Sequence, residues 1–375
     1  MKRIIQLIAI IMVLAAGQTA NARTGVTYSP AESTFSLETN DDAQQVKLCI
    51  YNDGLDGKPV KTVNMKRAES VNGGALWQVS VKEDLKGKFC VINDTHVRWP
   101  AIGAELDKIA EIAPACVIWN GDASNTEEKL ENLVNIYLDH SLERKDYAAE
   151  TPYLFCPGNH DSRGRANRHL EKVWMYRQPE ERDVRDWDLG RNFAVRLGEM
   201  ALVGMDTAED KLDTNPRFAG LFKSAEYREA QTAWLRDALK RPEIASAPYL
   251  VAFCHIPLFD DDPSHNPGDV APDDTDPRYT TDYAYWQRTC GNMWGPLLHE
   301  AGCQVLIVGH LHRYRYYAPG ADRCWAQLVG GGRDMKEGPG FPTVIEGKVL
   351  GDRLRLTVHN IFAGKVQDVF EFMPR

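Results

Sequence analysis

Hydrophobic and polar residues follow three different patterns along the chain. From Arg23 to about Lys88, apolar residues alternate with polar ones in short runs separated by Asn-Gly turn signals, which predicts strands. After Lys88, short wholly apolar runs alternate with segments whose apolar residues are spaced as on one face of a helix. From Thr343 to Phe372 the alternation returns without a helical period. The chain therefore predicts a strand-rich beginning, a longer middle part of strands and helices, and a closing set of strands.

The middle part has the pattern of a buried α/β core. Its wholly apolar runs are typical of strands that are buried on both faces. These runs cover residues 89–92, 116–119, 153–156, 201–205, 249–254 and 305–308. Helical spacing predicts helices over residues 101–113, 125–140, 165–176 and 226–240. This alternation of strands and helices predicts a mixed α/β domain.

The first residues have the features of a secretion signal. Lys2 and Arg3 precede a run of apolar residues, and the small residues Ala20 and Ala22 suit a signal peptidase. The apolar run is too short to span a bilayer. We therefore expect residues 1–22 to be removed, which leaves an exported protein, periplasmic or secreted, with no membrane span in its mature form. A retained N-terminal anchor is the alternative.

The strand-rich beginning predicts a separate module over residues 23–87. Short alternating strands with turns between them favour a small β-sandwich. Segments such as Tyr51-Asn-Asp-Gly and Trp77-Gln-Val-Ser-Val resemble the early-set immunoglobulin-like modules that precede catalytic domains in some carbohydrate-active enzymes. The chain departs from that family where the last strands of such a module would lie, which favours a structural support over glycan binding. Residues 88–375 form the second predicted domain.

Charge and cysteine content restrict the function further. The formal net charge is −9 at pH 7, and removal of Lys2 and Arg3 makes it more negative. Such a chain is a poor general binder of nucleic acid, whose phosphate backbone is recognised by clustered Lys and Arg. The 8 cysteines contain no CxxC pair, so disulfides do not define the fold. Cys290 and Cys324 are the candidates for a disulfide, and the oligomeric state does not follow from the sequence.

Potential metal ligands follow five of the apolar runs. Because ligands bind beyond the carboxyl ends of strands in α/β sheets, we expect these residues to converge at one edge. Carboxylates, imidazoles and an amide oxygen suit Mn²⁺, Fe or Zn²⁺. Two such ions about 3.5–4 Å apart would clamp a phosphoryl group and lower the pKa of a shared water. The residues are Asp94, His96, Asp122, Asn159, His255, His310 and His312.

Each motif taken alone also has a structural explanation. Asp94-x-His96 is a common turn cap, and Gly158-Asn-His-Asp161 could be only a tight turn. His255 alone is more often a core histidine whose hydrogen bonds are satisfied. Gly309-His-Leu-His312, after an apolar strand, is the most specific single element. The occurrence of all of them in order, each after a buried strand, favours a metal site.

Together the motifs resemble those of the calcineurin-like metallophosphoesterases. That family has the motifs DxH, GD, GNHD, H and GHxH, in the order in which they occur here. The resemblance covers about residues 88–375 and implies a four-layer α/β/β/α sandwich. Asp122 is followed by Ala-Ser-Asn without a Tyr, so the purple acid phosphatases within this family are a poor match.

The resemblance also implies a role for each residue. The first metal would be held by Asp94, His96, Asp122 and His312, and the second by Asp122, Asn159, His255 and His310. His160 would protonate the leaving oxygen or stabilise charge on the phosphoryl group, and Asp161 would orient it. The implied reaction is hydrolysis of a phosphate monoester or diester through in-line attack by a metal-bridging hydroxide, without a covalent enzyme intermediate.

Residues near the motifs predict substrate contacts. Arg163 could meet a phosphate or a surface carboxylate. Tyr283 and Trp286 end an acidic, Pro-rich insert that begins at residue 260, and they could stack on a nucleoside or sugar or anchor the insert on the core. The expected partner is a small phosphorylated substrate. The alternative function is a noncatalytic phosphate- or glycan-binding protein on the same fold.

Overall fold

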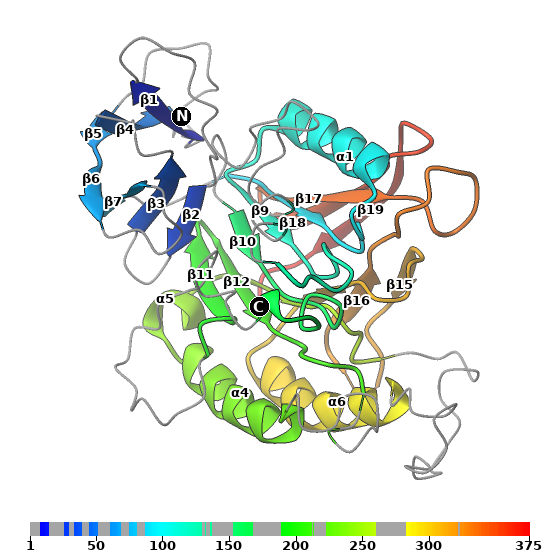
Figure 1. Ribbon diagram of the computed structural model, residues 1–375. Helices are drawn as coiled ribbons and strands as arrows, with labels where there is room; N and C mark the ends of the chain where they lie inside the picture. The colour runs from blue at the N-terminus through cyan, green and yellow to red at the C-terminus, as the bar shows by residue number, and fades with distance from the viewer. Residues whose placement is uncertain are drawn as a thin grey trace.

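Two large β-sheets and the helices on their outer faces make up most of the protein (Figure 1). A computed structural model describes residues 8–14, 26–29, 34–39, 45–51, 61–68, 75–80, 87–129, 132, 136, 153–167, 189–211, 213, 223–259, 283–321 and 323–375. Within this part of the chain, the strands form sheets of 3, 10 and 6 strands.

The 10-stranded sheet has the order β19-β18-β17-β8-β9-β10-β2-β3-β7-β6. Its central strands are parallel to one another: β8 (Phe89–Ile92), β9 (Cys116–Trp119) and β10 (Tyr153–Phe155). The C-terminal strands continue the sheet on the β8 side as antiparallel neighbours: β17 (Thr343–Leu350), β18 (Arg353–Asn360) and β19 (Lys365–Phe372). The closing alternation in the sequence thus forms one edge of this sheet.

The 6-stranded sheet has the order β11-β12-β13-β14-β16-β15. Its four inner strands are parallel: β12 (Met200–Met205), β13 (Tyr249–Cys254), β14 (Val305–Val308) and β16 (Ala326–Val329). The two edge strands are antiparallel to their neighbours: β11 (Phe193–Leu197) and β15 (Arg315–Tyr317).

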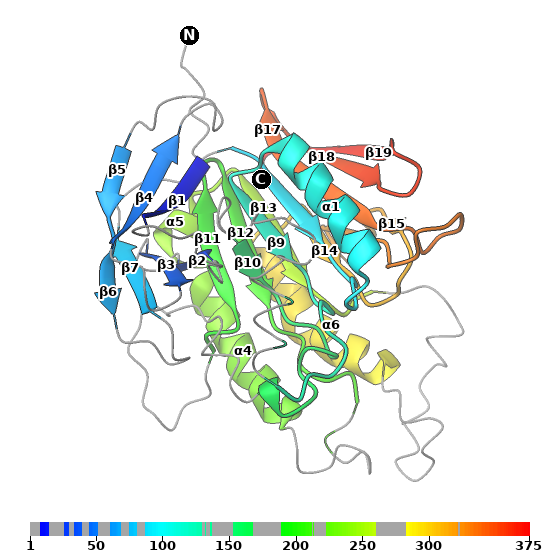
Figure 2. The same ribbon diagram turned by 45° about the horizontal axis from the view of Figure 1, so that its top comes forward.

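Helices cover the outer face of each large sheet, which gives four layers (Figures 1 and 2). The helix α1 (Trp99–Ile112) lies on the 10-stranded sheet against β17. The helices α4 (Ser224–Ala238) and α6 (Tyr283–Glu300) cover the 6-stranded sheet and contact each other, and the short α5 (Pro242–Ala245) lies against β11 and β12. The α/β class and the layer order expected from the resemblance are confirmed.

The strand β13 illustrates why the core strands are wholly apolar. Successive side chains of a strand point to opposite faces. Tyr249, Val251 and Phe253 pack in the cluster between the two sheets, whereas Leu250, Ala252 and Cys254 pack against the helices. The ring of Phe253 also contacts Phe89 of the other sheet edge-on, with centroids 5.8 Å apart. Burial on both faces therefore requires an uninterrupted hydrophobic run.

The N-terminal strands belong to two different sheets. The strands β1 (Ile8–Leu14), β4 (Gln45–Tyr51) and β5 (Lys61–Asn64) form the 3-stranded sheet. The strands β2 (Val26–Ser29), β3 (Thr34–Thr39), β7 (Ala75–Ser80) and β6 (Lys66–Ala68) extend the 10-stranded sheet, joined to β10 by the pair Thr27–Tyr153. An independent β-sandwich over residues 23–87 stays a prediction, as does the removal of residues 1–22, which would take away β1.

The remaining sequence expectations have mixed outcomes. The helices expected over 101–113 and 226–240 are present as α1 and α4, shifted by two residues or fewer at each end. Those expected over 125–140 and 165–176 fall largely outside the described residues, and their described starts, residues 125–129 and 165–167, are not α-helical. Cys290 and Cys324 are both free thiols, the first buried and the second exposed. Among the described residues, no helix has both the length and the apolar character needed to cross a membrane.

The contacts of Glu346 with His359 and Lys348 allow a stability test. Glu346 lies on β17, an interior strand of the 10-stranded sheet. Its carboxylate lies 3.5 Å from His359 Nε2 and accepts a hydrogen bond from Lys348 Nζ at 2.9 Å. The pKa of Glu346 falls from 4.5 to about 2, mainly because of the contact with His359. Lys348 lowers it further, whereas burial opposes the shift. Because the pKa is lower in the folded state, the ionised carboxylate stabilises the fold above the unfolded pKa, and this contribution is lost as the pH falls through the folded one.

We expect Glu346→Gln to lower the free energy of unfolding at pH 7 by about 1 kcal/mol, after solvent screening is allowed for. The difference from the wild type should shrink as the pH falls from 4.5 to about 2. Thermal unfolding of both proteins across this pH range measures it. A difference that stays constant with pH would contradict the role of the ion pairs.

Candidate metal centre

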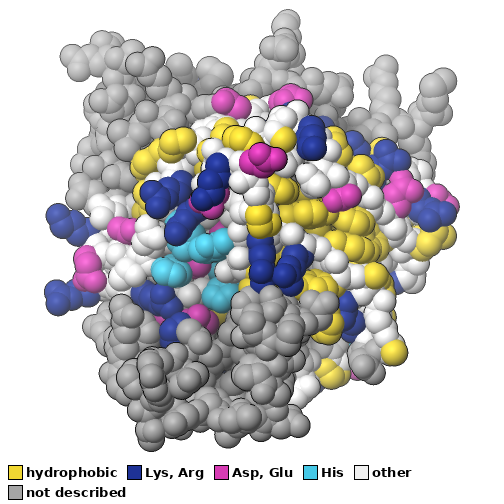
Figure 3. Space-filling model, turned by 90° about the vertical axis from the view of Figure 1, so that its right-hand side faces the viewer, with side chains coloured by type: hydrophobic (Ala, Val, Ile, Leu, Met, Phe, Trp, Pro, Cys, Tyr) yellow, Lys and Arg dark blue, Asp and Glu magenta, His cyan; other side chains and the backbone are white. Residues whose placement is uncertain are grey.

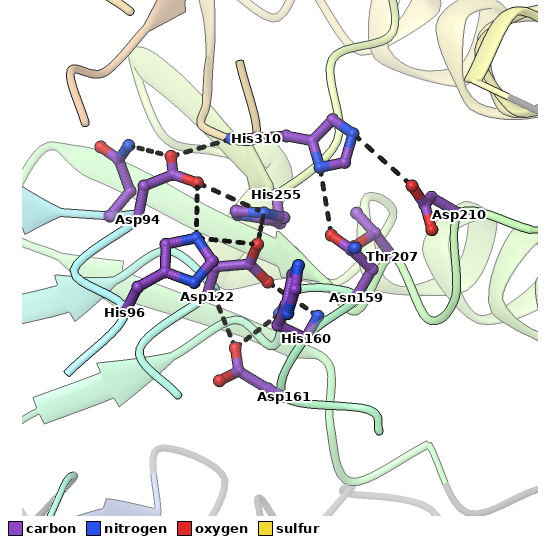
Figure 4. Close-up of polar contacts among 12 residues, drawn as sticks. Asp94, His96, Asp122, Asn159, His160, Asp161, Thr207, Asp210, His255 and His310 are labelled. Carbon is purple, nitrogen blue, oxygen red and sulfur yellow. Dashed lines mark hydrogen bonds and ion pairs between the residues drawn. The ribbon is translucent and has the colours of Figure 1, made fainter. Parts of the chain in front are cut away.

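The predicted metal ligands meet where the carboxyl ends of the parallel strands from both sheets face each other (Figure 4). Their ligand atoms form two groups that share Asp122, and within each group all atoms lie within 4.8 Å of one another. The first group is Asp94, His96, Asp122 and His312, and the second is Asp122, His255 and His310. Asn159 Oδ1 lies 3.1 Å from His310 Nδ1, beside the second group. All seven predicted ligands therefore lie in one place.

Asp94, which follows β8, has its two carboxylate oxygens in different surroundings. Its Oδ2 accepts hydrogen bonds from Asn93 Nδ2 at 2.5 Å and from the backbone N–H of His310 at 2.8 Å. Its Oδ1 is buried without a hydrogen-bond partner and lies 3.3 Å from His312 Nε2 and 3.7 Å from His255 Nε2. One oxygen thus fixes the carboxylate, and the other is directed at the imidazoles.

Asp122, which follows β9, lies between the two groups. Its Oδ1 accepts a hydrogen bond from the backbone N–H of His160 at 2.9 Å. Its Oδ2 lies 3.1 Å from His255 Nε2 and 3.5 Å from His96 Nε2. The His255 ring places Nδ1 at 2.9 Å from the carbonyl oxygen of Asn120, so Nδ1 carries a proton, and Nε2, which faces the carboxylates, is the nitrogen left to bind a metal once it is deprotonated. This is the tautomer that a metal-binding histidine needs.

The donor atoms fit a divalent cation. His255 Nε2 and Asp94 Oδ1 are both buried and have no hydrogen-bond partner, although each is a strong polar atom. His96 Nε2 and His312 Nε2 lie 2.9 Å apart, so both nitrogens would lie next to a cation held in the first group. Carboxylate oxygens and imidazole nitrogens without thiolate suit Mn²⁺, Fe or Zn²⁺. A cation in each group would satisfy atoms that the protein leaves unsatisfied.

The protonation states also favour cation binding. Burial is the main cause that lowers the pKa of His96 and of His310 to about 4, so both rings are neutral at pH 7. Burial is the largest single influence on Asp94 and Asp122 and opposes their charge, but the neighbouring histidines, His255 first among them, together outweigh it and hold the pKa of both carboxyls below the ordinary value. At His255 burial is likewise outweighed, because Asp122 and Asp94 raise its pKa to about 10. A proton on His255 and a cation therefore compete for the negative charge of Asp122 and Asp94.

The backbone of the site is held in a conformation that residues other than glycine rarely adopt. Such left-handed residues cost on the order of 1 kcal/mol each and gather at functional sites. The residues with positive φ are Asp94 (53°), His96 (44°), Asp122 (50°), His310 (70°) and His312 (51°). Two neighbours must be glycine, because a Cβ on Gly121 would overlap the His255 ring and one on Gly309 would come within 2.5 Å of Asp94 Oδ2.

Asp161 ties two of the ligand loops together. Its Oδ2 accepts hydrogen bonds from the backbone N–H groups of Asp122 at 2.7 Å and Gly158 at 2.9 Å. Its Oδ1 accepts two more, both at 2.9 Å, from the backbone N–H and the hydroxyl of Ser124. Because the carboxylate is buried, it fixes the loop after β9 against the loop after β10.

The His160 ring lies over the first ligand group. It contacts the His96 ring edge-on, with centroids 4.9 Å apart. Its Nδ1 lies 2.9 Å from the carbonyl oxygen of Asn125, which accepts the Nδ1 proton, and its Nε2 lies 3.3 Å from Arg163 Nη1. The orientation of the ring by Asp161 stays a prediction, and the loop that Asp161 fixes is the one that carries His160.

Two acidic residues of the site were missed by the motif analysis. The guanidinium of Arg163 donates to Glu209 from Nε at 2.8 Å and from Nη2 at 2.7 Å, and Nη2 also lies 3.0 Å from Asp210 Oδ1. Asp210 Oδ2 lies 3.9 Å from His310 Nε2. Both acids follow β12, which is parallel to β13 and ends at the same edge. The acidic segment after the apolar run 201–205, the one run of the six without a candidate ligand, was the signal that could have identified them.

Many of the described side chains around the site are basic, although acidic side chains also lie on this face and the whole chain is acidic. Figure 3 shows histidine side chains gathered on this face with Lys and Arg side chains around them. Tyr283 and Trp286 lie in the first turn of α6, but their side chains and residues 260–282 are outside the described part of the structure. Their contacts with substrate stay predictions.

Several solved structures are similar to this chain. One is the purple acid phosphatase PPD1 from yellow lupin (Lupinus luteus) seeds, with 11% identity, a TM-score of 0.49, and coverage of 98% of this chain and 69% of that one. Another is GAP50, the anchor in the inner membrane complex of Plasmodium (13% identity, TM-score 0.48, 77% and 89% covered). A third is Yfce, a phosphoesterase from E. coli (12% identity, TM-score 0.34, 76% and 98% covered).

At these identities and TM-scores, the solved structures do not by themselves assign a function. No curated protein matches the sequence. The family model described as calcineurin-like phosphoesterase matches residues 87–314, which span every predicted metal ligand and His160. This match covers more than half of the chain and includes the whole candidate metal centre. The chain therefore belongs to the calcineurin-like phosphoesterase family.

Proposed function

We propose that this protein hydrolyses phosphate esters with two divalent metal ions that share Asp122. The observation that supports this is the pair of ligand groups on either side of one carboxylate. When bound, the ions would supply a water-derived nucleophile at neutral pH and neutralise charge on the phosphoryl oxygens. The first ion would be held by Asp94, His96, Asp122 and His312, and the second by Asp122, Asn159, His255 and His310.

His160 is the residue proposed to assist the leaving group. Its backbone N–H is bound to Asp122 Oδ1, which fixes its distance from the ligand groups. Since the Asn125 carbonyl occupies Nδ1, the other nitrogen, Nε2, is the one that can exchange a proton with substrate. In its protonated form the ring would give the Nε2 proton to the oxygen that departs from phosphorus, and the product is a neutral alcohol.

Arg163 is the proposed contact to the phosphoryl group. Its Nε and Nη2 are directed to Glu209 and Asp210, while Nη1 lies beside His160 Nε2. A phosphoryl oxygen next to His160 would therefore lie within reach of a guanidinium that is already oriented. The Lys and Arg side chains around the histidines in Figure 3 would attract an anionic substrate. A role of Tyr283 and Trp286 in stacking on the rest of the substrate is part of the same proposal.

The metal dependence and the ester class can be tested together. We expect the purified protein to hydrolyse p-nitrophenyl phosphate, bis-p-nitrophenyl phosphate or both when Mn²⁺, Fe²⁺ or Zn²⁺ is added. EDTA treatment should abolish this activity because the carboxylates and imidazoles alone supply no activated water. Binding of phosphate without turnover in any metal would instead support the noncatalytic alternative and contradict the proposal.

We expect His160→Ala to lower kcat by on the order of 10²–10⁴-fold, the usual effect of losing a positioned acid. The ratio of metal to protein should stay at the wild-type value, because the His160 ring is not among the proposed ligands. The matched control is His299→Ala, which removes an exposed histidine near the end of α6. Activity and metal content are measured on the same samples. Unchanged turnover in His160→Ala would remove this residue from the mechanism.

The proposal also includes export. The basic start, the apolar run and the small residues Ala20 and Ala22 support removal of residues 1–22. N-terminal sequencing of the protein recovered from the periplasm or the medium of a bacterial host should begin at Arg23. A recovered protein that begins at Met1 and stays in the cytoplasm would contradict export.

A further inference from the structure

The loop that follows β12, residues 206–210, reaches the candidate metal centre although it carries none of the family motifs. Figure 4 shows Asn159 and Asp210 facing different nitrogens of the His310 ring. Asn159 Oδ1 is 3.1 Å from His310 Nδ1, and Asp210 Oδ2 is 3.9 Å from His310 Nε2. A ring that binds a metal through one nitrogen carries its proton on the other. With Nδ1 and Asn159 Oδ1 facing one cation, the Nε2–H would point at Asp210.

The same loop also determines where Arg163 lies. Glu209 accepts from Arg163 Nε at 2.8 Å and from Nη2 at 2.7 Å, which is a two-point contact with the planar guanidinium. This contact leaves Nη1 at 3.3 Å from His160 Nε2. Through this two-point contact Glu209 fixes the guanidinium plane against the His160 ring.

Buried polar groups, some of them from α4, hold this loop in place. Asp206 Oδ1 accepts from the backbone N–H of Ala208 at 2.8 Å, and this supports the positive φ of 53° at Ala208. The buried guanidinium of Arg228, from α4, donates to the carbonyl oxygens of Thr207 and Glu209. Gln231 Nε2, also from α4, donates to the Asp206 carbonyl oxygen at 2.6 Å. The loop is therefore rigid enough to position other residues.

The geometry points to Asp210 and Glu209 as positioning residues of this centre. Asp210 fixes the ring of the metal ligand His310, and Glu209 aims Arg163 at the substrate beside His160. This inference rests on the proposed function. It adds two residues of the loop after β12, a segment that the family motifs do not include. Neither residue touches the reacting atoms, so each acts through another side chain.

Asp210→Asn tests the first role. Because Arg163 and Lys211 donate to Asp210 Oδ1, the amide oxygen would face them and the amide NH₂, a donor, would face His310 Nε2–H. Calorimetric titration of Mn²⁺ or Zn²⁺ into the EDTA-treated full chain should then show one of the two metal affinities lowered roughly 10–100-fold and the other unchanged. Asp210→Glu, which keeps the carboxylate, should recover part of the loss.

Asp237→Asn is the matched control, because it removes one exposed carboxylate of α4. Its metal affinities should equal those of the wild type. Unchanged affinities in Asp210→Asn, or an equal loss at both metal positions, would overturn the positioning role of Asp210.

Glu209→Gln tests the second role and does not depend on how well Asp210→Asn folds. We expect unchanged metal affinities and a KM for the phosphate ester raised by about tenfold, with a smaller change in kcat, because Arg163 is no longer aimed. Arg163→Lys should have a similar effect. In the double variant, the loss of kcat/KM, expressed as a free energy, should be smaller than the sum of the losses in the two single variants. Additive losses, or lost metal in Glu209→Gln, would overturn this role.

The measurements separate this inference from the proposed function. A wild-type protein that binds no divalent metal and hydrolyses no phosphate ester overturns the proposed function, and the inference falls with it. A wild-type protein that binds two ions and turns over, beside Asp210→Asn and Glu209→Gln variants that behave as wild type, overturns the inference alone.

Discussion

The buried carboxylate of Asp122 is the group on which the rest of the site depends. It is 1% exposed and yet ionised, so it must be matched by positive charge or by hydrogen-bond donors. One oxygen receives the backbone N–H of His160, and the other faces His255 and His96. The backbone N–H of Asp122 is in turn bound by Asp161. A displacement of this residue would therefore change both ligand groups and the position of His160 together.

The fold can hold such a residue because its strands are buried on both faces. Loops at the ends of β8, β9, β12 and β14 carry left-handed, costly backbone conformations. Those conformations persist only if the strands cannot shift, and the wholly apolar strands, packed between the other sheet and the helices, meet this requirement. The hydrophobic pattern that predicted the strands is thus also the reason that the polar loops keep their geometry.

The sequence predicted the local elements well because their signals are local. The bounds of β8, β9, β13 and β14 agree with the apolar runs, since each run is followed at once by a glycine or a polar residue. The seven ligand candidates were also predictable, because the rule that parallel strands end at one edge needs no coordinates.

The pairing between segments that are distant in the sequence could not be predicted. The continuation of β10 by β2 depends on the Thr27–Tyr153 pair, which no local pattern encodes. The contact of Arg163 with Glu209 joins residues 46 positions apart. A tight spacing of ligands such as Gly309-His-Leu-His312 is recognisable, whereas Asp206-Thr-Ala-Glu-Asp210 looks like an ordinary polar loop until the register of β12 beside β13 places it at the site.

The charges explain why the loop after β12 supports the metal centre and is not a third metal position. Glu209 and Asp210 are matched by Arg163 and Lys211, whose nitrogens lie 2.7 Å and 2.5 Å from their nearest oxygens. Asp94 and Asp122 have no Lys or Arg within ion-pair distance among the described residues, and the rings of His96 and His310 beside them are neutral at pH 7. Among the described residues, the negative charge of Asp94 and Asp122 is therefore opposed by histidines, chiefly His255, whose proton a cation can replace. Divalent cations are attracted there, and the neutralised pair next to them is left to orient His310 and Arg163.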